Sequence, residues 1–174
     1  MITTDTTWTT TVRAPFGPLQ LTSDGTALTR LLITASPQDP TWRKDPGPFS
    51  QVIEELAEYF DGERQTFGTP IRLVGTAFQQ SVWAALRDIP YGQTRTYGEI
   101  AAAIGSPSAV RAVGLANSRN PISILVPCHR VVGSTGALTG YSGGIDNKRL
   151  LLDLERRTVG IGQDSLLTST AANS

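Results

Sequence analysis

Residues 96–118 read TYGEIAAAIGSPSAVRAVGLANS, and this stretch decides the fold of the second half of the chain. The capping box Thr96 to Glu99 predicts the start of a short helix, which Gly105 ends in the left-handed conformation. Ser106-Pro107, as N-cap and first helical residue, predict a second helix through Ser118. Two short helices joined by a tight turn form a helix-turn-helix candidate, although other helical hairpins show the same pattern.

The segments on either side of this stretch have equally local signals. Upstream, the capping box Thr76 to Gln79 predicts a helix that runs to about Ile89. Downstream, the apolar run 122–126 predicts a buried strand or extended segment that leads to a turn at Cys128. Together these elements predict a mostly helical region.

The C-terminal segment begins with a candidate N-cap, Asp146, which predicts a last helix over residues 147–157. Residues 158–174 contain mainly glycine, serine, threonine and alanine with scattered leucines, so we expect a disordered tail. Three leucines should lie on the inner side of the helix: Leu150, Leu151 and Leu154.

The first half of the chain has a different pattern. Segments 8–12, 19–22 and 27–33 are typical of short strands, because turn residues rich in Gly, Pro and Asp separate them. Apolar residues at helical spacing predict a helix over 49–60. Residues 67–75 read as a linker with a short strand at 71–74.

These elements predict an α/β (α+β) fold with two domains. Residues 1–75 should form a small domain of a sheet and a helix, and residues 76–157 a mostly helical domain with the helix-turn-helix. The length of 174 residues and the 39% hydrophobic content are sufficient for such a core without disulfides or metals.

Cysteine content and hydropathy exclude several classes of protein. The chain has one Cys and one His, so it cannot form an internal disulfide and has too few ligands for an ordinary zinc site. No segment is apolar for long enough to span a bilayer, and no early apolar run resembles a signal peptide. We therefore expect a cytoplasmic protein without a metal or a membrane partner.

The net charge of zero conceals an asymmetry. Residues 1–75 carry a net charge of −3, residues 76–157 a net charge of +4 and the remainder −1. A positive half is a hint of a polyanionic partner, although scattered solvated charges would give the same count.

The stretch Pro127-Cys128-His129-Arg130-Val131 joins the only cysteine to the only histidine. A thiolate is the reactive form of cysteine, and a neighbouring base or cation favours it near neutral pH. This pairing indicates nucleophilic chemistry at Cys128. The alternative is a buried cysteine that acts as a small hydrophobic residue.

Several short motifs, taken in order, resemble the O6-alkylguanine-DNA alkyltransferases, also called methylated-DNA-protein-cysteine methyltransferases. The similarity covers residues 76 to about 157 closely, whereas the first half resembles the family's variable N-terminal domain only in layout. The matching residues are Thr96-Tyr97-Gly98-Glu99-Ile100, Arg111-Ala112-Val113-Gly114, Asn117, Asn120-Pro121, Pro127-Cys128-His129-Arg130-Val131, Tyr141-Ser142-Gly143-Gly144, Lys148 and Glu155.

The resemblance implies a catalytic role for five residues. Cys128 would attack the alkyl carbon on guanine O6, and His129 would activate it through a bound water while Glu155 orients the imidazole. Tyr97 would help to extrude the damaged nucleotide and donate a hydrogen bond to the departing guanine. Asn120 would tie the recognition helix to the cysteine turn. Without the resemblance, His129 could be a structural histidine and Glu155 a solvated carboxylate.

The resemblance also implies a DNA surface and a base pocket. Arg111 would take the vacated place in the base stack, while small residues let the helix enter the minor groove. The small residues are Ala112, Gly114 and Ala116, and Ser106 and Ser108 are assigned to the same surface. Tyr141, Ser142 and Val131 would line the pocket, with Ser142 donating to O6. The glycines near Ser142 could instead form a phosphate cradle or an idle loop.

The implied partner is double-stranded DNA that contains O6-alkylguanine, bound by a monomer, with clustering on DNA left open. No cofactor is implied, because the damaged base supplies the alkyl group. Certain family members hold a structural zinc in the N-terminal domain, which this chain has no spare Cys or His to bind. Alkyltransferase-like proteins lack the acceptor cysteine, so Cys128 places this chain with the active group.

Two other functions remain open at this point. A cysteine amidase or peptidase could use Cys128, His129 and Glu155, although such enzymes usually take their histidine from a distant segment. A helix-turn-helix regulator with a sensory N-terminal half would bind a specific DNA sequence without needing Cys128.

Overall fold

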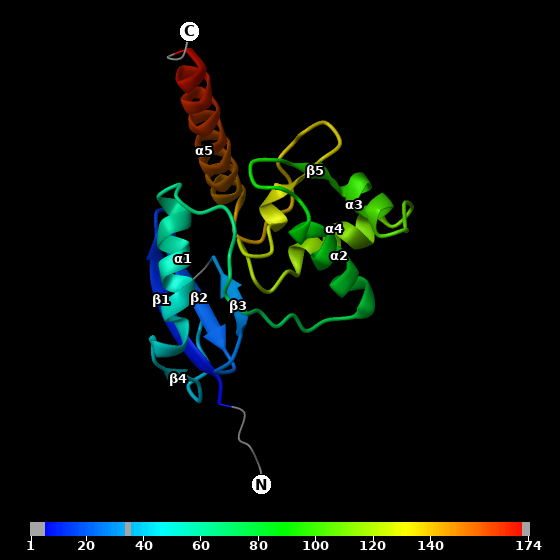
Figure 1. Cartoon of the computed structure of the whole chain (residues 1–174). Helices are drawn as coiled ribbons and strands as arrows, with labels where there is room; N and C mark the ends of the chain where they lie inside the picture. The colour runs from blue at the N-terminus through cyan, green and yellow to red at the C-terminus, as the bar shows by residue number, and fades with distance from the viewer. Residues whose placement is uncertain (1–5, 34–35, 172–174) are drawn as a thin grey trace.

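The computed structural model describes residues 6–33 and 36–171, and Figure 1 shows a sheet flanked by helices. The sheet has the strand order β3-β2-β1-β4, in which β2 is antiparallel to both neighbours and β4 is parallel to β1. The three expected strands are therefore confirmed. Their bounds are Trp8–Ala14 for β1, Gly17–Ser23 for β2, Leu28–Leu32 for β3 and Arg43–Lys44 for β4.

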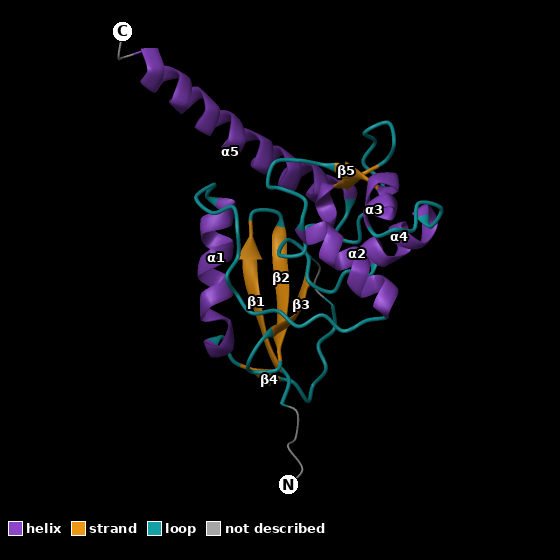
Figure 2. Ribbon diagram, turned by 45° about the vertical axis from the view of Figure 1, so that its right-hand side comes forward, coloured by secondary structure: helices purple, strands orange, loops and turns teal. Residues whose placement is uncertain are grey.

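Helix α1 spans Ser50–Phe60 and follows the short 3-10 helix η1, Gly47–Phe49. Figure 2 shows α1 beside the sheet. Its buried side includes Val52 and Leu56, as the helical spacing predicts, and also Tyr59, which that spacing did not include. The expected strand at 71–74 is reduced to one bridge, in which Ile71 pairs with Leu28 at the start of β3.

The second half contains α2 (Ala77–Arg87), α3 (Tyr97–Ala103) and α4 (Val110–Ser118). Both capping boxes are confirmed, with the Thr76–Gln79 and Thr96–Glu99 pairs each making the two reciprocal hydrogen bonds. A short parallel pairing of β5 (Arg95–Thr96) with β6 (Val131–Val132) joins α3 to the cysteine turn. The observed architecture is mixed α/β, with a sheet domain followed by helices, as expected.

The start of α4 differs from the prediction. The helix begins at Val110 rather than Pro107, and Ala109 precedes it without a side-chain cap. The backbone N–H of Ser106 instead donates to Ala101 O (2.9 Å) and closes the end of α3, while Gly105 has a φ of +76°. Ser106 therefore completes the first helix in a Schellman-type end and does not start the second.

Residues 122–126 do not form a continuous strand. Ile122 makes a parallel bridge to Leu31 of β3, and the chain then turns at Ile124, whose φ is +73°. This conformation is unfavourable for a β-branched residue. The side chain of Asn120 holds the turn, because its amide donates to Val126 O (2.7 Å) and its oxygen accepts from Ile122 N (3.0 Å).

Helix α5 spans Ile145–Ala171, so Asp146 lies in its first turn rather than before it. The helix continues through residues 158–171, for which a disordered tail was expected, and residues 172–174 lie outside the described part of the chain. Thr158 and Val159 continue the helix because they pack closely against the loop glycines Gly62 and Gly92. This tertiary contact compensates for a composition that disfavours a helix.

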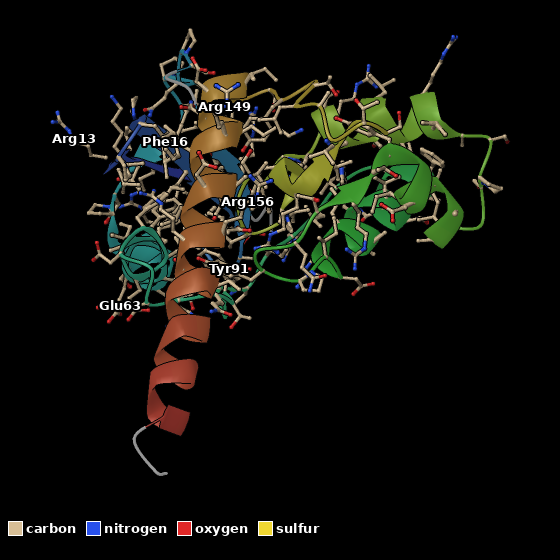
Figure 3. All side chains as sticks on the ribbon, turned by 90° about the horizontal axis from the view of Figure 1, so that it is seen from above. Arg13, Phe16, Glu63, Tyr91, Arg149 and Arg156 are labelled. Carbon is tan, nitrogen blue, oxygen red and sulfur yellow. The ribbon has the colours of Figure 1, made fainter. Side chains whose placement is uncertain are left out.

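The inner side of α5 also differs from the prediction by one position. Leu151 and Leu152 are buried, Leu154 is half-buried and Leu150 is exposed. Figure 3 shows α5 running between α1 and the helices of the second half, with Tyr91 beside it. Within the described residues, no helix is long and apolar enough to cross a membrane.

Candidate active site

Cys128 and His129 lie on the short 3-10 helix η2 (Cys128–Arg130), which follows the turn at Ile124. Both side chains are buried, with exposed fractions of 1% and 0%. Three other elements converge on this turn: α5 contributes Glu155, α1 contributes Tyr59 and the loop after α2 contributes Gly92.

The carboxylate of Glu155 is the centre of a buried hydrogen-bond network. Its Oε1 accepts from His129 Nε2 (2.8 Å), Arg130 Nη2 (2.9 Å) and Tyr59 Oη (2.8 Å). Its Oε2 accepts from Arg130 Nε (2.9 Å) and Gly92 N (3.1 Å). Burial opposes ionisation, but His129 and Arg130 outweigh it and hold the pKa of Glu155 well below its usual range.

His129 is arranged as a neutral base. Burial lowers the pKa of His129 and the positive charges of Arg130 and Lys148 lower it further, although Glu155 raises it. Because the ionised Glu155 can only accept, Nε2 carries the ring proton and Nδ1 keeps its lone pair. Among the described residues, buried Nδ1 has no hydrogen-bond partner. The imidazole can therefore accept a proton at Nδ1.

Burial favours the thiol form of Cys128 over the thiolate. Burial raises the pKa of Cys128, and interactions with Asn120, Lys148 and Ser123 reduce this shift without reversing it. The neighbours of Cys128 thus favour the thiolate, as expected, but burial opposes it. Attack by the sulfur requires that a base first remove its proton.

Two asparagines join α4 to the cysteine turn. Asn120 shapes the turn as described above, and Asn117 on α4 donates from Nδ2 to Cys128 O at 3.4 Å. Asn117 belongs to the motifs that carry the resemblance, but no role was predicted for it.

A loop over residues 133–144 closes on the site. Thr139 O accepts hydrogen bonds from Tyr97 Oη (3.1 Å) and Lys148 Nζ (2.9 Å), and Lys148 also donates to Val131 O. Burial lowers the pKa of Lys148 to about 8, against the raising effect of Cys128. Tyr141 is buried beside Lys148, whose Nζ lies 5.9 Å from the ring centroid.

The neighbouring Ser142 is exposed, and Val131 is buried in β6. These two residues and Tyr141 therefore lie on segments that adjoin the cysteine turn. The glycine-rich loop contacts Tyr97 and Lys148 and is not an isolated surface loop.

The candidate DNA surface lies on α4 and the turn before it. Arg111, Ala112 and Ser108 are exposed, Ser106 is half-buried, and Gly114 is half-buried toward the ring of Tyr97. The predicted role of Ala116 at this surface is wrong. Ala116 is buried, and its carbonyl accepts from the indole of Trp83 at 2.9 Å.

Three further groups of the site were not predicted. Arg130 belonged to the matching motifs and follows Cys128 and His129 in the sequence, but no role was predicted for it. Lys148 belonged to the matching motifs but looked like a surface residue on a helix. Tyr59 gave no signal beyond its place on the buried side of α1, because its contact with Glu155 spans 96 positions of the chain.

Both halves of the chain match family descriptions. Residues 77–157 match the DNA binding domain of 6-O-methylguanine DNA methyltransferase, and residues 8–73 match its ribonuclease-like domain.

Curated relatives and solved structures agree with these matches. The methylated-DNA-protein-cysteine methyltransferase of Mycobacterium tuberculosis H37Rv is 54% identical over 84% of this chain and 90% of its own length. The methylated-DNA-protein-cysteine methyltransferase of Methanosarcina acetivorans is 48% identical over 82% of this chain and 94% of its own length.

A crystal structure of Mycobacterium tuberculosis O6-methylguanine methyltransferase has a TM-score of 0.82 and 52% identity, covering 87% of this chain and 94% of that one. The crystal structure of OGT from the same organism in complex with DNA has a TM-score of 0.81 and 53% identity, and the match covers 85% of this chain and 92% of that one. With its buried cysteine, histidine and glutamate next to two paired helices, the chain belongs to the 6-O-methylguanine DNA methyltransferase family.

Proposed function

We propose that this protein repairs DNA by transferring the alkyl group of O6-alkylguanine, typically methyl, irreversibly to Cys128. The observation that carries this proposal is the arrangement of Cys128, His129 and Glu155 on one turn and one helix. A thiol next to a neutral imidazole, whose other nitrogen is bound by a carboxylate, has the parts needed for an activated nucleophile.

The reaction begins with proton transfer. His129 Nδ1 accepts the thiol proton of Cys128 through a bound water, and Glu155 stabilises the imidazolium that forms. The sulfur then attacks the alkyl carbon, a C–S bond forms, and the bond between that carbon and O6 breaks. The electron pair passes to the guanine, which takes up a proton, and the hydroxyl of Tyr97 donates a hydrogen bond to the departing base.

The product determines the stoichiometry. A thioether has no good leaving group, so nothing in the site regenerates Cys128 and each molecule acts once. No cofactor takes part, since the damaged base is the alkyl donor.

Access to Cys128 requires extrusion of the base and opening of the loop at 133–144, because the sulfur is buried. Tyr97 must release Thr139 O before it can bind the guanine. Arg111, exposed on the first turn of α4, fills the gap in the base stack. Ala112, Gly114, Ser106 and Ser108 lie along the minor groove, while Tyr141, Ser142 and Val131 line the pocket.

The protein acts on double-stranded DNA as a monomer, and clustering of several molecules along DNA is compatible with that state. The reaction consumes a free thiol, which the reducing cytoplasm maintains. We therefore assign the protein to that compartment.

Intact-mass spectrometry tests the function directly. After incubation with a duplex that contains O6-methylguanine, the protein is expected to gain one methyl group, and peptide mapping should place it on Cys128. An unmodified protein would refute the proposal. Repeated turnover on an ester or amide substrate would indicate the cysteine amidase or peptidase instead, and sequence-specific binding that is independent of Cys128 would indicate a regulator.

Substitution of Arg111 tests the predicted DNA surface. Arg111→Ala should slow transfer from duplex DNA about tenfold, because flipping costs a few kcal/mol of unstacking that the arginine offsets. Transfer from the free base O6-methylguanine should not change. Arg119→Ala, an exposed arginine after the end of α4, is the control. Equal losses on both substrates would contradict the role of Arg111.

A further inference from the structure

Tyr59 connects the N-terminal domain to the catalytic network. Its hydroxyl donates to Glu155 Oε1 at 2.8 Å, and the same oxygen holds His129 Nε2 at 2.8 Å. We propose that Tyr59 is a positioning residue for alkyl transfer, which competes with His129 for one carboxylate oxygen and so keeps the imidazole in its neutral form. This inference rests on the proposed function.

The surroundings of Tyr59 fix its hydroxyl in place. The side chain is fully buried, and its ring contacts Phe60, Phe67 and Tyr91 at centroid distances of 5.4, 5.5 and 6.1 Å. An enclosed ring cannot turn its hydroxyl to another partner. Burial and the charge of Glu155 also raise the pKa of Tyr59 well above its ordinary value, so the phenol remains a donor.

The charged groups around His129 determine how one additional hydrogen bond to Glu155 affects the protonation of the imidazole. Glu155 and Lys148 act on it from α5 and Arg130 from its own turn, while Tyr59 acts through Glu155. Each hydrogen bond to Oε1 disperses negative charge that would otherwise stabilise an imidazolium. Because a protonated His129 cannot accept the thiol proton, dispersal of this charge favours the active form of the site.

The same geometry gives the N-terminal domain a direct part in the chemistry. Arg130 also binds Glu155, but it comes from the cysteine turn itself and has a second anchor at Ile89 O. Within the described part of residues 1–75, Tyr59 is the group that hydrogen-bonds to this carboxylate. Docking of α1 therefore sets the hydrogen bonding of the acceptor site.

The test uses the full chain and Tyr59→Phe, which preserves the ring and removes only the hydroxyl. Since His129 is the only histidine, its ring signals in NMR spectra need no assignment by mutation. We expect the pKa of His129 to rise by about half a unit in the variant. The acidic limb of the pH profile for methyl transfer to Cys128 should move upward by the same amount.

Thr9→Val is the matched control, because it removes another buried hydroxyl of the N-terminal domain, which donates to Leu21 O at 3.0 Å. This control should reduce stability without changing the pKa of His129 or the acidic limb of the pH profile for methyl transfer. An unchanged His129 titration in Tyr59→Phe, with transfer slowed equally at every pH, would overturn the inference and leave Tyr59 a packing residue.

The NMR measurement also separates this inference from the proposed function. A wild-type protein that transfers no methyl group would refute the function. The imidazole titration would still report whether Tyr59 controls His129, because it requires no reaction.

Discussion

Cys128→Ala is expected to abolish methyl transfer completely. No other side chain of the chain is a thiol, so the variant has no equivalent acceptor. The variant protein should show no mass increase after incubation with O6-methylguanine duplex, under conditions in which the wild type is fully converted. The loss is an all-or-none effect, because the sulfur forms the new bond itself.

Binding and stability serve as controls for this variant. The exposed side of α4 does not include Cys128, so the affinity for damaged duplex should remain within a few-fold of that of the wild type. Cys128→Ser replaces the thiol with a hydroxyl of similar size and should also fail, since a buried hydroxyl is a far weaker nucleophile than a thiol. Methylation of either variant at another residue would show that Cys128 is not the acceptor.

Glu155→Gln is expected to cause the largest loss of stability. The change removes the negative charge that Arg130, only 6% exposed, pairs with through two hydrogen bonds. Removing one partner of a buried ion pair typically costs about 3 to 5 kcal/mol, because the other charge stays buried and uncompensated. Denaturant unfolding measures this loss, and methyl transfer should slow because His129 loses the group that orients it.

Asp153→Asn on the same helix is the control for Glu155→Gln. Asp153 pairs with Arg156 at the surface, at 3.6 Å, and both side chains are about half exposed. Surface pairs of this kind contribute little to stability, so the midpoint of unfolding should not change measurably. Similar losses in the two variants would contradict the central place of Glu155.

The same network predicts how stability depends on pH. The pKa of Glu155 is lower in the folded state than its ordinary value of 4.5, so its contribution is present above that value and is lost as the pH falls below it. The pKa of His129 is also lowered from 6.5, so protonation of the unfolded chain begins to favour unfolding below that pH. Stability should therefore fall in acid, and less steeply below pH 4.5 in Glu155→Gln.

Local hydrogen-bond patterns explain why much of the fold could be predicted. The capping boxes at Thr76 and Thr96 involve residues three positions apart, so the sequence alone places the starts of α2 and α3. Turn residues between apolar segments likewise predicted strands β1 to β3. The catalytic residue types and the pairing of Cys128 with His129 were equally visible, since those two residues are adjacent.

The structure differs from the predictions where specific contacts outweigh local helix and strand propensity. Ser106 was expected to start α4 but closes α3, and the apolar run at 122–126 became a turn because Asn120 bonds to both of its ends. The C-terminal helix continues past Arg157 because Thr158 and Val159 pack against Gly62 and Gly92. The first two differences arise from hydrogen bonds between residues at most six positions apart, and the third from a tertiary contact. In all three, these contacts outweighed helix and strand propensity.

The sequence by itself determined the layout of strands and helices, the family motifs and the identity of the acceptor cysteine, because these depend on residue type and short spacing. Only the tertiary structure decided the pKa values of the groups in the site. Glu155, Arg130 and Tyr59 meet from α5, the cysteine turn and α1. Burial of the site lowers the pKa of His129 and raises the pKa of Cys128. Hydrogen bonds between residues up to 96 positions apart and the removal of these groups from water arise only when the chain has folded.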